Sequence, residues 1–74
     1  MIMALSRPKW TWRDADEIAL DLVERHPGID PLTVSLPEIK QLVLDLPTFE
    51  DDPEAATNRV LETIQAAWYD EYED

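Results

Sequence analysis

The scarcity of glycine constrains the fold of this chain more than any other feature. Gly28 is the only glycine in 74 residues, whereas an all-β fold needs many tight turns and those turns depend on glycine. We therefore expect a mainly α-helical fold, and the length fits one small domain. No cysteine is present to form a disulfide. Stability must come from packed apolar side chains, which make up 45% of the sequence.

Two segments in the first two thirds of the chain have apolar residues at helical spacing. The first helix is expected over Ala15–Arg25, where Asp14 and Glu17 have the spacing of a capping box. The second is expected over Leu36–Leu46. Ser35 precedes it as an N-cap, with a glutamate three residues later.

A third helix is expected to begin at Pro53 after an N-cap at Asp52, because proline is favoured at the first helical position. Apolar residues at helical spacing follow it as far as the acidic end of the chain. A short extended element is expected near Leu32–Val34, and Phe49 is expected to pin the preceding loop to the core. The expected fold is therefore a small three-helix domain.

The formal net charge is −11, from 17 acidic and six basic residues. Such a charge repels nucleic acid and anionic membranes, and it favours basic proteins and cations. Oxygen-rich carboxylate groups suit hard cations such as iron. A solvated surface that serves only solubility is the alternative interpretation. The acidic residues form three groups: the acidic stripe Asp14, Glu17, Asp21 and Glu24; the acidic loop Glu50, Asp51, Asp52 and Glu54; and the acidic end Asp70, Glu71, Glu73 and Asp74.

The residue inventory argues against catalysis. Without cysteine, and with His26 as the single histidine, the chain lacks the ligands of most zinc sites and the parts of a Ser–His–Asp triad. No apolar run approaches the roughly 20 residues of a membrane span, and no secretory signal is recognisable. A non-catalytic, cytoplasmic protein is expected.

Three motifs resemble the IscX (YfhJ) family, whose members are small acidic proteins of bacterial iron–sulfur cluster assembly. They are H-P-x-x-D-P at residues 26–31, F-E-D-D-P at 49–53 and W-x-D-E at 68–71. The resemblance covers about residues 12–72, which leaves residues 1–11 as a partly disordered tail. The K-W-T with which the family begins matches Lys9–Thr11, whereas counting back from the first motif selects Trp12.

The resemblance implies a modified winged-helix fold and a monomer. It also implies weak, reversible binding of Fe²⁺ or Fe³⁺ and docking onto the cysteine desulfurase IscS, in possible competition with frataxin. In that setting the protein would act as a regulator, an adaptor or an iron donor. The carboxylates matched to iron binding are Asp14, Glu17, Asp21, Glu24, Glu50, Asp51 and Asp52, and those matched to partner docking are Asp14, Glu17, Asp21, Glu24, Asp70 and Glu71.

Two other functions remain open from the sequence. An acyl-carrier-type protein is also acidic, helical and about this size, and it would carry its prosthetic group on Ser35. The flanking V-S-L-P differs from the usual D-S-L, and mass spectrometry of the expressed chain would reveal a phosphopantetheine group. The other alternative is an acidic DNA mimic that blocks a nucleic-acid-binding protein.

Overall fold

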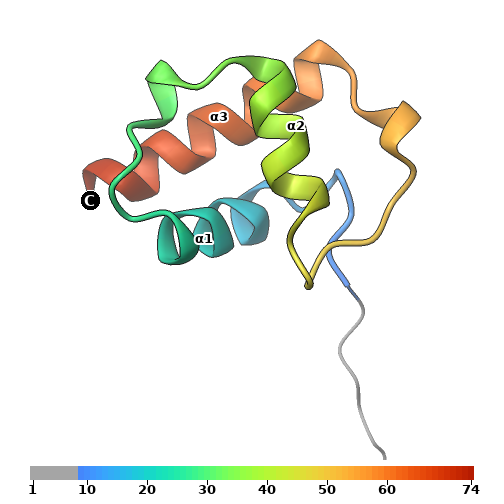
Figure 1. Cartoon of the computed structure of the whole chain (residues 1–74), viewed down its shortest axis with the longest axis horizontal. Coiled ribbons are helices and arrows are strands. Elements are labelled where there is room, and N and C mark those ends of the chain that lie inside the picture. The colour runs from blue at the N-terminus through green and yellow to red at the C-terminus, as the bar shows by residue number, and fades with distance from the viewer. Residues whose placement is uncertain (1–8) are drawn as a thin grey trace, which may run out of the picture.

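Within residues 9–74 the fold is mainly helical, as expected, with three α-helices and two short 3₁₀ helices (Figure 1). A computed structural model describes residues 9–74. Residues 1–8, which form most of the expected tail, lie outside the described residues. The elements in chain order are α1 (Ala15–Arg25), η1 (Pro31–Thr33), α2 (Leu36–Leu44), η2 (Pro53–Ala55) and α3 (Asn58–Glu73).

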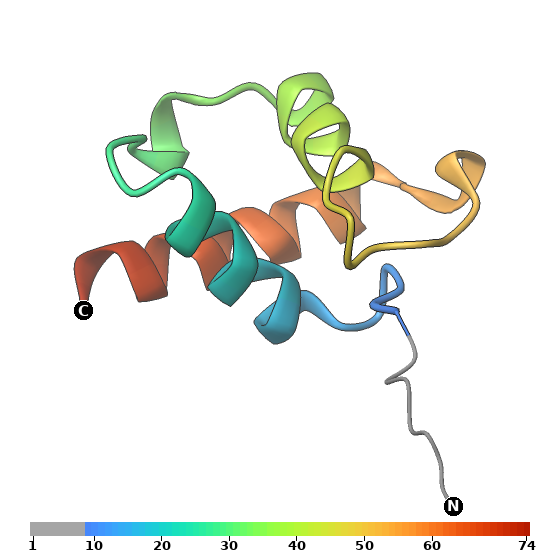
Figure 2. The ribbon, with the colours of Figure 1, turned by 60° about the horizontal axis from the view of Figure 1, so that its bottom comes forward.

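Helices α1 and α3 lie side by side and run in the same direction, and α2 packs across them (Figures 1 and 2). The start of α1 is therefore next to the start of α3, and the last turn of α1 is near the C-terminal end of the chain. The side chain of Gln65 on α3 holds η1 in place, because its Nε2 donates to the carbonyl oxygens of Pro31 at 2.9 Å and Val34 at 3.3 Å.

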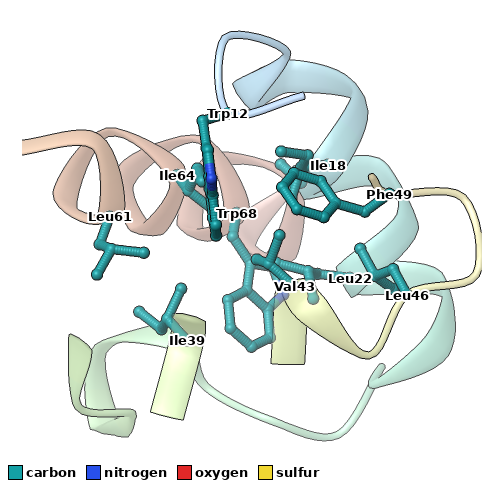
Figure 3. Close-up of a cluster of buried hydrophobic side chains, with 11 residues drawn as sticks. Trp12, Ile18, Leu22, Ile39, Val43, Leu46, Phe49, Leu61, Ile64 and Trp68 are labelled. Carbon is teal, nitrogen blue, oxygen red and sulfur yellow. The ribbon is translucent and has the colours of Figure 1, made fainter. Parts of the chain in front are cut away.

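Trp68 of α3 is at the centre of the hydrophobic core (Figure 3). The side chain is fully buried, among apolar residues from all three helices that include Leu22 of α1 and Ile39 and Val43 of α2. Burying a side chain of this kind contributes about 1.5–3 kcal/mol. Within the described residues, the indole N–H of Trp68 has no hydrogen-bond partner.

The segment before α1 is anchored by two tryptophans. Trp12 is 5% exposed and packs edge-on against Phe49, with ring centroids 4.5 Å apart. Its indole Nε1 donates to the carbonyl oxygen of Asp52 at 2.8 Å. Trp10 forms an isolated parallel bridge with Phe49, in which Trp10 N donates to the Thr48 carbonyl oxygen at 2.7 Å. The expected role of Phe49 in pinning this loop is thus confirmed.

That bridge is the only β-type pairing among residues 9–74. The extended element expected near Leu32–Val34 is wrong, because Pro31–Thr33 forms η1 instead. Asp30 favours this outcome, since its carboxylate accepts a hydrogen bond from Leu32 N at 3.0 Å and closes a tight turn. The winged-helix variation stays a prediction.

The two capping boxes expected from sequence have different outcomes. At α2 both hydrogen bonds form: Glu38 N donates to the Ser35 hydroxyl, and Ser35 N donates to the Glu38 carboxylate at 3.1 Å. These bonds from Ser35 hold the pKa of Glu38 below its usual range. At α1 the bounds Ala15–Arg25 are as predicted, but the capping box is wrong because Asp14 makes no side-chain cap.

Two helix boundaries differ from the prediction. Helix α2 ends at Leu44 rather than Leu46. Pro47 disfavours helical geometry in the residue before it, and it has no backbone N–H to continue the hydrogen bonds of the helix. Asp52 and Pro53 start the short η2, while α3 itself begins at Asn58. Thr57 supplies the actual N-cap, with its hydroxyl accepting from Val60 N at 3.2 Å.

Candidate functional site

The acidic stripe on α1 has an inner pair and an outer pair of carboxylates. The inner pair, Asp14 and Asp21, is half-buried and hydrogen-bonded, whereas the outer pair, Glu17 and Glu24, is exposed. The sequence spacing put all four on one stripe. Hydrogen bonds engage only two of them among residues 9–74: Asp21 with distant residues, and Asp14 with the nearby Thr11.

Asp21 joins three segments of the chain. Its Oδ2 accepts a hydrogen bond from the indole Nε1 of Trp10 at 3.0 Å and another from the hydroxyl of Thr48. It therefore ties α1 to the N-terminal segment and to the loop after α2. Hydrogen bonds to a charged acceptor are stronger than those between neutral groups, so Asp21 is mainly a structural residue.

Asp14 stabilises the turn that leads into α1. Its Oδ2 accepts from Thr11 N at 2.8 Å and from the Thr11 hydroxyl at 3.2 Å. This contact points away from the helix, towards the preceding residues. Asp14 is the N-cap residue of α1, but with its carboxylate turned towards Thr11 it makes no side-chain hydrogen bond to the helix.

The outer face of α1 carries Asp16, Glu17 and Glu24, all exposed to solvent. Leu20 lies between them along the helix and is 45% exposed. The sequence prediction missed Asp16. Its spacing of four residues from Leu20 and eight from Glu24 places it on the same helical face and could have identified it.

The acidic loop lies next to the start of α1. Trp12 N donates to Asp51 Oδ2 at 3.1 Å, and the Trp12 indole donates to the Asp52 carbonyl oxygen. The carboxylate of Asp52 accepts from Glu54 N at 2.9 Å and begins η2. Glu50 is exposed and has no side-chain hydrogen bond among the described residues. The fold thus brings the acidic loop beside the N-terminal end of the acidic stripe.

The acidic end lies on the last turns of α3, at the other end of the α1–α3 pair (Figure 2). Asp70 is exposed and Glu71 is half-buried. The hydroxyl of Tyr69 donates to Glu73 Oε2 at 2.8 Å. This hydrogen bond and the charge of Glu73 raise the pKa of Tyr69 above its usual value.

Within residues 9–74, the acidic surface has no basic partner. Among residues 9–74, no lysine or arginine nitrogen lies within 4.0 Å of a carboxylate oxygen. The same residues also bring together no group of three or more His, Asp or Glu side chains that could hold a metal ion. The structure therefore presents dispersed, unpaired carboxylates, and iron binding stays a prediction.

Ser35 has a structural role that accounts for its position before α2. Its hydroxyl accepts from Glu38 N and donates to Glu38 Oε1 at 3.0 Å. In the part of the chain that the structure describes, no helix has the length and apolar character needed to cross a membrane.

The comparisons with known proteins cover the part of the chain that contains the three motifs. The model of a family described as iron–sulphur cluster assembly matches residues 10–73. The uncharacterized protein PA3808 of Pseudomonas aeruginosa is 45% identical over 60 residues, covering 81% of this chain and 91% of the relative. The chain therefore belongs to the iron–sulphur cluster assembly family, the IscX (YfhJ) family that its sequence resembles.

Proposed function

We propose that this protein is a non-enzymatic accessory of iron–sulfur cluster assembly in the cytoplasm, and that it docks its acidic surface onto the cysteine desulfurase IscS. The observation that carries this proposal is the unpaired outer face of α1. Asp16, Glu17 and Glu24 are exposed there, and within residues 9–74 no cation neutralises them. A basic partner would be steered towards such a surface, and its binding would weaken as salt screens the charges.

The docking surface in this proposal is narrower than the sequence suggested. Asp14 and Asp21 hold the fold together through Thr11, Trp10 and Thr48. We therefore assign docking mainly to the outer pair Glu17 and Glu24, with the acidic end of α3 alongside it. Reversing all four charges would mix a binding effect with a folding effect.

Iron would be a cargo held by exposed carboxylates. Glu17, Glu24 and Glu50 are accessible oxygen donors of the kind that hard cations prefer. Because the described carboxylates are dispersed, binding should be weak and reversible. That behaviour suits delivery or sensing of iron better than storage.

The test is calorimetric titration of the purified protein with purified cysteine desulfurase at low and at moderate salt. The wild-type protein should bind, and its affinity should fall steeply as salt rises. The double reversal E17K/E24K should weaken binding about tenfold or more, as expected when attraction across an interface becomes repulsion.

The matched control is D45K/E62K, which makes the same change in net charge at two exposed positions, the C-cap residue of α2 and a residue of α3. It should reduce affinity much less than E17K/E24K. An equal loss in both variants would show that the partner senses total charge rather than this face. No binding by the wild-type protein at low salt would reject the docking proposal.

A further inference from the structure

A cleft of about 510 Å³ lies between the segment leading into α1 and the first turns of α3. Its apolar lining comes from Trp12 and Ala15 on one side and from Ala55 and Val60 on the other. Trp12 is nearly fully buried, whereas Ala15 and Val60 are half-buried. The cleft therefore has an apolar floor that is open to solvent.

Two arginines line the same cleft. Arg13 is in the turn before α1 and Arg59 is in the first turn of α3, and both are exposed. They are two of the three arginines among residues 9–74. Neither guanidinium lies within 4.0 Å of a carboxylate in the described part of the chain.

Asp51 is the only acidic residue in the lining, and its carboxylate is already engaged. It accepts hydrogen bonds from Trp12 N at 3.1 Å and from Asp52 N at 2.7 Å. The lining thus carries two positive charges and one negative charge, on a chain whose net charge is −11. This local reversal of sign is independent of the acidic surface on which the proposed function rests.

We propose that this cleft binds an acidic segment of a partner protein. Carboxylates of that segment would pair with Arg13 and Arg59, because a guanidinium presents a planar fork of donors that matches a carboxylate. An apolar side chain of the same segment would rest on the half-buried Ala15 and Val60, beside Trp12. The proposal requires neither iron nor the desulfurase.

The shape and charge of the cleft select this occupant. Buried small-molecule sites enclose most of their ligand, whereas Arg13, Ala55, Arg59 and Thr63 are all exposed around this cleft. A second copy of the chain would carry the same net charge of −11 and would be repelled. An extended acidic segment meets the arginines without bringing a whole acidic protein with it.

Binding can be measured by titrating the isotope-labelled protein with a short synthetic peptide in which glutamates flank one leucine. Backbone signals of Arg59, Val60 and Thr63 and the indole signal of Trp12 should shift together. A peptide with lysines in place of the glutamates should leave the signals of the cleft unchanged. Replacing the leucine by serine should weaken binding, because the apolar floor then loses its contact.

The two arginines are tested by R13Q and R59Q. Each should lower the affinity for the acidic peptide about fivefold, the upper range for an exposed ion pair. The matched control is R25Q, which removes one positive charge from the exposed last turn of α1, outside the cleft. It should leave the affinity almost unchanged.

A55E gives an independent test, because it places a negative charge on the exposed lining without removing an arginine. It should abolish peptide binding while the circular dichroism spectrum stays that of the wild type. The proposal is overturned if the wild-type signals of the cleft do not shift, or if R25Q weakens binding as much as R59Q. A concentration-dependent dimer that fills the cleft and excludes the peptide would also overturn it.

Discussion

The inner and outer carboxylates of the acidic stripe are separated by about one helical turn of α1 and differ in what surrounds them. Asp21 accepts hydrogen bonds from Trp10 and Thr48, whereas Glu24, three residues later, is exposed. In the same way, Asp14 accepts a hydrogen bond from Thr11, whereas Glu17, three residues later, is exposed. A run of like charges can therefore contain both hydrogen-bonded carboxylates that stabilise the fold and exposed carboxylates that do not, and the difference is set by the residues around each side chain.

Removing the most connected inner carboxylate should have the largest effect on stability. Asp21→Ala removes the carboxylate that accepts hydrogen bonds from the Trp10 indole and the Thr48 hydroxyl in a partly buried site. We expect a loss of about 2 kcal/mol in the free energy of unfolding, about 1 kcal/mol for each hydrogen bond. Urea denaturation followed by circular dichroism measures this loss.

The control for that experiment is Asp21→Asn, which keeps an acceptor oxygen and should recover part of the lost stability. If Asp21→Ala unfolds at the same urea concentration as the wild type, the division of the stripe into inner and outer pairs is wrong.

Asp14→Ala should have an intermediate effect. Among residues 9–74, its carboxylate is hydrogen-bonded only to Thr11, a near neighbour in the chain, so the substitution removes a local contact and no long-range one. We expect a decrease of about 1 kcal/mol in the free energy of unfolding. Thermal unfolding beside Thr11→Val, which removes the hydroxyl donor but keeps Thr11 N–H, tests whether the backbone hydrogen bond carries most of the effect.

Glu17→Ala and Glu24→Ala should change stability by no more than about 0.5 kcal/mol, the usual range for exposed substitutions. Both side chains are exposed and, among residues 9–74, neither makes a side-chain hydrogen bond. The same urea experiment serves as the measurement. A loss as large as that of Asp14→Ala would show an unrecognised structural role for the outer pair.

Glu38 sharpens the comparison, because it is exposed and yet hydrogen-bonded. Bonds from Ser35 lower its pKa below the ordinary value of 4.5. The stabilisation that the ionised Glu38 carboxylate gives to the folded protein is therefore fully present above that value. It is lost as pH falls through the lowered pKa of the folded state. Comparing unfolding at about pH 6 and about pH 3, Glu38→Gln should lose slightly less stability on acidification than the wild type. An identical loss in both proteins would contradict this account.

The sequence predicted the bounds and caps of the helices best where a single start or stop signal was present. The bounds of α1 follow from its apolar spacing and from Pro27 and Gly28 after it, and Ser35 with Glu38 predicted the cap of α2. The start of α3 was mispredicted because two cap signals, Asp52 and Thr57, lie close together. Each satisfies local hydrogen bonds, so the local pattern alone could not rank them.

The acidic character of the candidate site was predictable from the sequence. Which of its acidic residues are exposed was predictable only in part. Sequence spacing placed Glu17 and Glu24 on one face of α1, and they are exposed there. It could not exclude Asp21, whose partners Trp10 and Thr48 are 11 and 27 residues away. The cleft with Arg13 and Arg59 was also beyond sequence analysis, since the two arginines line the same cleft only once the segment before α1 has packed beside the start of α3.

The sequence by itself determined the family, the three helices and the strongly acidic character of this protein, because motif order, helical periodicity and charge are properties of the chain. Only the tertiary structure decided which carboxylates are hydrogen-bonded within the fold, which remain exposed, and which two arginines line one cleft. Those outcomes depend on contacts between residues far apart in the chain, and such contacts exist only after the helices have packed around Trp68.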